Sequence, residues 1–325
     1  MSERMSRRGF LGQSAVAGAA AMAAGAALPA GAGERRAATA QAEPMPFGMI
    51  GKVKISRLML GGNLVGGWLH ARDLKYLGGL FRAYATEEKI LQTFALAEKC
   101  GINTVFETGA PQVEKYNRQF GGHMQIIPHI DVNEQQTEQE LKDQLKMIMD
   151  AGACAMYVWG VSSDKLMMAG DIKRLARAVE LAKLTGVPVG VGSHSLLVPM
   201  ACEKEKVPAD FYVKTLHSDD YPSATPKELR KEFIWLTGGK GWYDNMWCID
   251  PEETIAFMKT VTKPWVAFKV LAAGAFLPRE GFTYAFKNGA DFIAVGMFDF
   301  QVRGDCDVAR QVISECQKRE RAWRA

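Results

Sequence analysis

The sequence lacks the short motifs that mark several common kinds of site. Its 325 residues contain no Cys-x-x-Cys pair, no His-x-His or His-Glu-x-x-His motif, and no Gly-x-Gly-x-x-Gly motif after a strand. These absences give no support to a zinc ribbon, a zincin or a dinucleotide-binding Rossmann domain. The net charge is only +4, and five arginines against two glutamates in residues 1–42 account for three of those charges. A nucleic-acid-binding surface, which needs clustered basic residues, is not indicated.

The first 42 residues resemble an export signal. The segment Ser6-Arg7-Arg8-Gly9-Phe10-Leu11 precedes an Ala- and Gly-rich stretch at 15–30, and Ala40-Gln41-Ala42 is a small-residue cleavage site. Paired arginines in this order resemble a twin-arginine signal, which implies passage through the twin-arginine export machinery and a periplasmic or extracytoplasmic destination. The alternative is an N-terminal membrane anchor, but Ala and Gly are weakly apolar, so no stable membrane span is expected.

The six cysteines do not suggest a disulfide framework. A protein that folds before export keeps its thiols reduced in the cytoplasm, so we expect free cysteines despite the oxidising destination. They are Cys100, Cys154, Cys202, Cys248, Cys306 and Cys316.

From residue 50 onward, apolar strand-like runs alternate with amphipathic helix-like segments. Thr86 and Thr137 each stand where a helix N-cap is expected, and Glu140 completes a capping box with Thr137. Eight strand and helix pairs in about 280 residues are typical of a (β/α)8 TIM barrel, predicted as one domain over 43–325. An open doubly wound sheet is the alternative. The predicted strands are 56–60, 104–106, 125–130, 155–161, 188–191, 211–216, 265–270 and 292–297.

Two connections are too long to be simple turns. Residues 63–85 and 218–249 both lie on the carboxyl side of the predicted barrel and are rich in Trp and Tyr. Long loops in compact domains are usually lids or binding loops. Their aromatic side chains either attach the loops to the barrel or form a surface on which sugar rings stack.

Ionisable residues gather at the predicted strand ends, where ligands bind in parallel barrels. Imidazole and carboxylate groups are ligands for zinc, manganese or iron, so the sequence predicts a divalent metal site formed by Glu107, His129, His194 and His217. The alternative is that each histidine is a hydrogen-bonded group in a polar barrel mouth. His70 and His123 are interpreted as structural. The full set of strand-end residues is Glu107, His129, Asp131, His194, Lys214, His217, Lys269 and Asp299.

Lys214 and Lys269 also lie in predicted strands. A desolvated lysine can form a Schiff base or act as a base, whereas an ordinary one would pair with Asp299 or Glu107. The predicted catalytic residues are His194, His217, Lys214, Lys269 and Asp131.

Several short segments resemble the aldo/keto reductase superfamily. They are Gly101-Ile102-Asn103 with Glu107-Thr108, Met156-Tyr157-Val158-Trp159, Leu58-Met59-Leu60-Gly61-Gly62 and Val270-Leu271-Ala272-Ala273-Gly274. The resemblance implies a TIM barrel and, as an alternative cofactor, retained NAD(P), NADP above all. The family's catalytic tetrad of Asp, Tyr, Lys and His is not recoverable, because Phe106 and Val158 stand at the Asp and His positions. Tyr116 is the candidate for the Tyr position.

Three functions therefore remain. The favoured one is an exported enzyme with lyase, isomerase or hydrolase chemistry on a small, sugar-like substrate, assisted by a metal. The others are a divergent oxidoreductase that retains its nicotinamide cofactor, and a barrel that binds a ligand without converting it.

Overall fold

The computed structural model describes residues 44–240 and 242–325, so the predicted export signal lies outside the described residues. Eight parallel strands form a closed barrel in chain order, and the last pairs with the first through Ile293 and Leu58. This confirms the predicted (β/α)8 TIM barrel. The barrel strands are β3 (Leu58–Gly61), β4 (Thr104–Glu107), β5 (Gln125–Ile130), β6 (Met156–Val158), β7 (Val189–Ser193), β8 (Phe211–Thr215), β9 (Trp265–Phe268) and β10 (Phe292–Val295).

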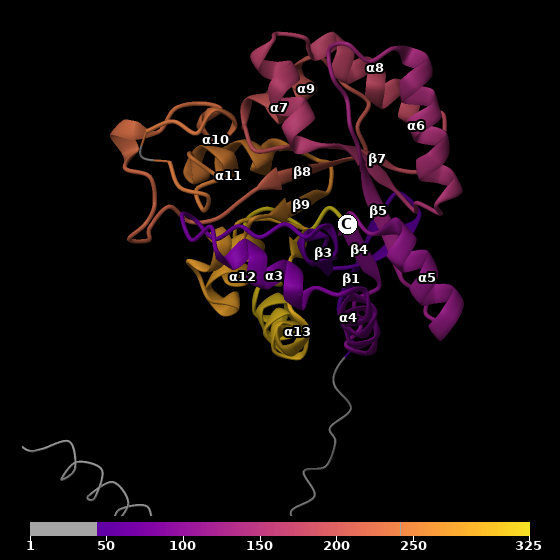
Figure 1. Cartoon of the computed structure of the whole chain (residues 1–325). Coiled ribbons are helices and arrows are strands. Elements are labelled where there is room, and N and C mark those ends of the chain that lie inside the picture. The colour runs from indigo at the N-terminus through magenta and orange to yellow at the C-terminus, as the bar shows by residue number, and fades with distance from the viewer. Residues whose placement is uncertain (1–43, 241) are drawn as a thin grey trace, which may run out of the picture. The chain divides into compact units, whose positions relative to one another are not determined.

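Helices surround the strands, as Figure 1 shows for α4, α5, α6, α8, α12 and α13. The predicted N-caps at Thr86 and Thr137 are confirmed: each hydroxyl accepts the backbone N–H three residues on, and Glu140 completes the capping box. The helices are α2 (Asn63–Gly66), α3 (Leu77–Tyr84), α4 (Glu87–Lys99), α5 (Ala110–Phe120), α6 (Glu138–Asp150), α7 (Gly160–Met168), α8 (Ile172–Lys183), α9 (Leu197–Lys204), α10 (Ile234–Thr237), α11 (Pro251–Thr260), α12 (Pro278–Lys287) and α13 (Asp299–Glu315), with 3₁₀ turns η1 (Lys227–Leu229) and η2 (Ala272–Gly274).

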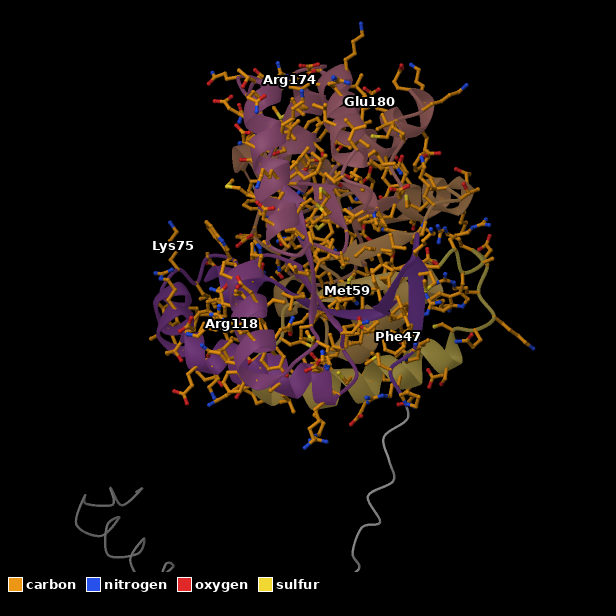
Figure 2. All side chains as sticks on the ribbon, turned by 90° about the vertical axis from the view of Figure 1, so that its right-hand side faces the viewer. Phe47, Met59, Lys75, Arg118, Arg174 and Glu180 are labelled. Carbon is orange, nitrogen blue, oxygen red and sulfur yellow. The ribbon has the colours of Figure 1, made fainter. Side chains whose placement is uncertain are left out.

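The barrel interior is filled by apolar side chains that alternate with outward-facing ones along each strand. Met59, labelled in Figure 2, lies among them and is fully buried. Phe106 and Tyr157 stack in the same interior with their ring centroids 4.9 Å apart. The side chains of this inner cluster are Ile50, Ile55, Met59, Phe106, Ile127, Ala155, Tyr157, Phe211, Val213, Val266, Phe292 and Ala294.

A β-hairpin that the sequence did not predict closes the amino end of the barrel. Strands β1 (Phe47–Ile50) and β2 (Val53–Ser56) pair antiparallel, and Phe47 marks this hairpin in Figure 2. The hairpin is attached to the amino ends of β4 and β5, where Asn103 accepts the Ser56 N–H and Gln125 donates to the Lys54 carbonyl. The predicted single strand 56–60 is therefore two strands, and the carboxyl end is the end left for a ligand.

The C-terminal segment joins the same end through buried ion pairs. Asp291, just before β10, contacts Arg319 at 2.8 Å and Arg321 at 2.7 Å, with both arginine side chains almost fully buried. Such pairs are costly to break singly because the remaining charge stays buried. Among the described residues all six cysteines are free thiols. No helix in that part of the chain is both long and apolar enough to cross a membrane.

Candidate active site at the carboxyl end of the barrel

Glu107, His129 and Trp159 form one side of the barrel mouth. His129 shares the inward face of β5 with Ile127, and its ring stacks on Trp159 with centroids 5.1 Å apart. The Trp159 indole N–H donates to Glu107 Oε1 at 2.9 Å. Within the described residues His129 Nδ1 is buried without a hydrogen-bond partner. This side therefore offers a fixed carboxylate and an imidazole nitrogen.

Lys269 follows β9 and lies on the other side of the mouth. Its ammonium group lies 4.2 Å from the centre of the Trp247 ring and hydrogen bonds His70 Nε2. His70 Nδ1 in turn lies 2.8 Å from Asp244 Oδ1. A carboxylate only accepts hydrogen bonds, so Nδ1 carries the proton and Nε2 presents its lone pair to Lys269. Asp244, His70 and Lys269 thus form a hydrogen-bonded chain that ends in the mouth.

Both charged groups stand in strained backbone. Glu107 has a φ of 85° and Lys269 a φ of 60°, in the left-handed region that residues with a Cβ seldom adopt. Each such residue costs of the order of 1 kcal/mol or more and tends to occur at functional sites. If the backbone of both residues had the extended conformation of the strands, their side chains would point in other directions. The positive φ angles therefore determine where Glu107 and Lys269 point.

Burial changes the proton affinity of Lys269. Desolvation lowers its pKa to about 8, against the opposing effect of the Glu107 and Asp244 carboxylates. The charged form is disfavoured because the surrounding protein solvates an ammonium group poorly. Lys269 can therefore exchange a proton near neutral pH, which ordinary lysines do not.

A cavity of about 250 Å³ lies between the ends of β3, β4, β9 and β10, and Glu107, His70 and Lys269 all line it. Most of its remaining wall is apolar or backbone. The aromatic part of the wall comes from Trp68, Phe81, Phe106, Phe268 and Phe298. An apolar pocket with a few convergent polar groups is the usual form of a small-molecule site.

His194 occupies a separate buried position beside this mouth. Its Nδ1 lies 2.7 Å from Asp164 Oδ2, and Asp164 also accepts the His194 N–H, the Ser195 N–H and the Trp235 indole N–H. The ring contacts Trp247 at a centroid distance of 5.0 Å. Burial lowers the pKa of His194, with Asp164 acting in the opposite direction. His194 is thus a neutral, oriented imidazole next to the loop that carries Trp247.

His217, predicted as a catalytic residue and metal ligand, lies buried just after the end of β8. Its Nε2 accepts the backbone N–H groups of Trp247 and Cys248, both at 2.9 Å, and its Nδ1 donates to the Ser218 carbonyl. Both ring nitrogens are therefore occupied, and burial lowers the pKa of His217 to about 4. The neutral ring holds the end of the 218–249 loop on β8.

Lys214 and Asp131 also lie away from the mouth. Val213 faces the barrel interior, so Lys214, the next residue of β8, points outward and is fully buried. Its amine donates to the Thr215 hydroxyl at 2.9 Å. Asp131 accepts a hydrogen bond from Ser162 in α7. Their predicted catalytic roles are not supported by these positions.

The predicted metal ligands are not brought together. Glu107 and His129 share the mouth with Trp159, whereas the nitrogens of His217 are used by backbone groups and His194 is held by Asp164. In residues 44–240 and 242–325 no group of three or more His, Cys, Asp or Glu side chains could hold a metal ion. The donor set therefore does not fit the predicted divalent cation.

Two further sequence interpretations need correction. Asp299 does not pair with Lys269; it accepts from Tyr84 and forms an ion pair with Lys89 at 3.0 Å. Tyr116, the candidate for the reductase tyrosine, donates to Glu98 between α4 and α5. Neither residue is among those that line the mouth cavity.

The sequence interpretation missed several residues of the site. His70, interpreted as structural from the sequence, lines the cavity. The sequence pattern does not single out Asp244, Asp164 or Trp159 as site residues, although Trp159 belongs to one of the reductase-like segments. The available signal was that 63–85 and 218–249, which carry His70 and Asp244, both lie on the carboxyl side. Helix α7, which carries Asp164, was not predicted at all.

Comparison with solved structures shows the same fold. A solved structure described as an aldo-keto reductase from Pseudomonas aeruginosa is similar to this chain, with a TM-score of 0.56 and 14% sequence identity. The match covers 82% of this chain and 94% of that one. Truncated 3-deoxy-D-arabino-heptulosonate 7-phosphate synthase from Thermotoga maritima matches at a TM-score of 0.44 and 10% identity, over 84% and 91%. No protein-family model matches the sequence. No curated protein matches it either. The first match shows a shared TIM-barrel fold, and the second is too weak to support an inference.

Proposed function

We propose that the protein is an enzyme of the lyase or isomerase type that moves a proton on a small polar substrate. The observation that carries the proposal is the convergence of Glu107, Lys269 and His70 on one cavity. Glu107 and Lys269 both stand in strained backbone there. Strain and a lowered lysine pKa at one pocket are features of catalytic sites rather than of ordinary ion pairs.

The two charged groups suit opposite roles in proton transfer. Glu107, oriented by the Trp159 indole, serves as the base that removes a proton from carbon or oxygen. Lys269, with a pKa of about 8, supplies or accepts a second proton near neutral pH. His70 connects Lys269 to Asp244 and so provides a path by which the lysine is returned to its starting state.

The walls favour a sugar-like substrate. Trp68 and Phe268 line the cavity, and the Trp247 ring lies beside Lys269. Aromatic faces stack on the apolar faces of sugar rings while polar groups hold the hydroxyls. Hydrolysis would use the same base, with Glu107 taking a proton from a water molecule that attacks the substrate. No metal step is included, because the donor set does not fit one.

We also propose that the protein acts outside the cytoplasm, supported by the twin-arginine-like segment around Arg7 and Arg8.

The test is proton exchange at carbon. The purified full chain is incubated in D₂O with a panel of aldoses, ketoses and sugar acids, and loss of C–H signals is followed by NMR. We expect exchange or conversion of at least one compound, a drop of 10²-fold or more in Glu107→Gln, the usual size of a general-base contribution, and no change in the exposed control Glu134→Gln. Exchange that survives Glu107→Gln would contradict the proposal, and binding without any exchange would favour a non-catalytic barrel.

A second candidate is an oxidoreductase with retained NAD(P). Two observations favour it. The chain shares its fold with a protein described as an aldo-keto reductase, and the cavity lies beside the ends of β9 and β10. Nicotinamide absorbance and fluorescence in the protein as purified would support it, and a reduced cofactor consumed by a carbonyl compound would establish it.

A further inference from the structure

We propose that Lys269 is a nucleophile that forms an imine with an aldehyde or ketone group of the substrate. The inference rests on the proposed function, since it places the substrate in the same cavity, and it adds the chemical class of the substrate and a covalent step. It also gives Lys269 a role that proton transfer alone does not require.

The partners of Lys269 favour a reactive amine. Two other partly buried lysines contact carboxylates directly, Lys89 with Asp299 at 3.0 Å and Lys263 with Glu203. Among the described residues Lys269 instead contacts an imidazole nitrogen and an aromatic face. A carboxylate in direct contact would fix the ammonium form, whereas an imidazole lone pair can remove its proton.

The Asp244 and His70 pair prepares that proton transfer. Asp244 accepts from His70 Nδ1, so Nε2 is the basic nitrogen and faces Lys269. When the proton moves from Lys269 to Nε2, the resulting imidazolium is stabilised by the Asp244 carboxylate. The neutral amine is then left in a cavity whose wall includes Phe268 and Val270.

The covalent step balances without an oxidant or a reductant. The amine lone pair attacks the carbonyl carbon, and the carbonyl oxygen takes the proton from His70 to give a carbinolamine. Loss of the oxygen as water leaves a protonated imine, so that ammonium plus carbonyl give iminium plus water. The iminium then accepts the electron pair of a neighbouring C–H bond while Glu107 takes the proton, which gives an enamine. Return of a proton to carbon regenerates the iminium. Hydrolysis by water restores Lys269 and releases the product.

Reactivity near neutral pH distinguishes this amine from exposed ones. With a pKa of about 8, roughly a tenth of Lys269 is neutral at pH 7. An unperturbed lysine with a pKa near 10.4 has less than about a thousandth in that form. Lys75, which is exposed and points away from the ribbon in Figure 2, is a matched internal control.

Imine formation is tested by reductive trapping. The full chain is treated at pH 7 with glycolaldehyde or dihydroxyacetone and sodium cyanoborohydride, and labelled peptides are quantified by mass spectrometry. We expect Lys269 to be labelled at least tenfold faster than Lys75, and His70→Gln to reduce that ratio. Lys269→Arg should remove the label at this position while circular dichroism shows an unchanged fold.

The outcomes separate this inference from the proposed function. If Lys269 is labelled no faster than Lys75, the imine is refuted, while Glu107-dependent exchange in D₂O would still support proton transfer. If Lys269 is labelled rapidly and no compound exchanges protons, the imine stands and the proposed proton transfer by Glu107 fails. The trapping comparison uses the unmodified chain, so it does not depend on whether a variant folds.

Discussion

Burial of Lys269 in the site lowers the stability of the folded protein. Its pKa falls from 10.5 to about 8 on burial, and its backbone φ is 60°. Below pH 8 the ammonium is charged in both folded and unfolded chains, but it is less well solvated in the folded one. Between pH 8 and 10.5 the unfolded chain binds more protons, so this penalty disappears as the pH rises.

Replacing Lys269 with Met should therefore stabilise the protein at pH 7. We expect a gain of about 2 kcal/mol in the free energy of unfolding, discounted from the full shift at 1.36 kcal/mol per pKa unit, together with loss of turnover. At pH 10 the gain should shrink. Urea denaturation at the two pH values measures both, and a variant less stable than the parent at pH 7 would show that the His70 contact outweighs desolvation.

His217 stabilises the folded protein, whereas burial of Lys269 destabilises it. Its neutral ring accepts two buried backbone N–H groups, and burial lowers its pKa from 6.5 to about 4. Above pH 6.5 the ring is neutral in both states and the stabilisation is complete. As the pH falls from 6.5 towards 4 the unfolded chain takes up the proton first, so stability is lost.

His217→Phe should cost about 2 to 4 kcal/mol, because two buried N–H groups lose their acceptor, and it should make the acid dependence shallower. The slope that remains should come partly from His194, whose pKa burial also lowers. Activity per folded molecule should persist. Thermal melts from pH 4 to pH 8 provide the comparison, and a stable but inactive variant would return His217 to the catalytic set.

At the scale of elements, two loops meet above Lys269. His70 and Arg72 belong to 63–85, Asp244 and Tyr243 to 218–249, and the pairs His70–Asp244 and Arg72–Tyr243 join them. The second loop is also attached to the barrel, since the Trp235 indole N–H donates to Asp164 in α7. Aromatic residues such as Trp235 therefore attach the 218–249 loop to the barrel. Deleting residues 227–241 would remove the buried Trp235 as well as any part of the loop that covers the mouth.

Asp244→Asn tests this junction with little change of volume. An amide can bond His70 Nδ1 but cannot stabilise the imidazolium, so we expect turnover to fall about 10- to 100-fold, as for partners that orient a functional imidazole, with a shift in its pH profile. The unfolding free energy should change by less than about 1 kcal/mol, as expected for a partly exposed pair. Arg72→Gln in the same junction should leave the pH profile in place; if both variants change it equally, Asp244 only holds the loops.

The elements that the sequence predicted well are those set by local chemistry. The capped helices at Thr86 and Thr137 and the apolar strands follow from short-range patterns. The hairpin Phe47–Ser56 and helix α7 were missed, because their short segments gain stability from packing on the barrel. Long-range pairings such as His70 with Asp244, 174 residues apart, leave no local signal.

At the scale of the whole molecule, strand order determines which residues reach the mouth but not where their side chains point. Topology correctly placed Glu107, His129 and Lys269 at one end, since strand ends are fixed once the fold is known. It could not say whether a side chain points in or out. Lys214 points outward by alternation, while the positive φ of Glu107 and Lys269 departs from strand geometry altogether. Metal coordination depends on those directions, and strand order alone could not provide them.

The localisation prediction concerns residues 1–42, which are not among the residues that the structure describes. Arg7 and Arg8 precede the Ala- and Gly-rich stretch at 15–30. We expect Arg7→Lys with Arg8→Lys to keep the protein in the cytoplasm with the same melting temperature as the exported form. Cell fractionation with a cytoplasmic and a periplasmic marker measures the first, and thermal melts of the purified double variant measure the second. Lys preserves charge but not the planar guanidinium fork, so the pair also tests recognition rather than charge. Unchanged appearance in the periplasm would show that the paired arginines are not the signal, and the substrate would then have to be sought among cytoplasmic carbonyl compounds.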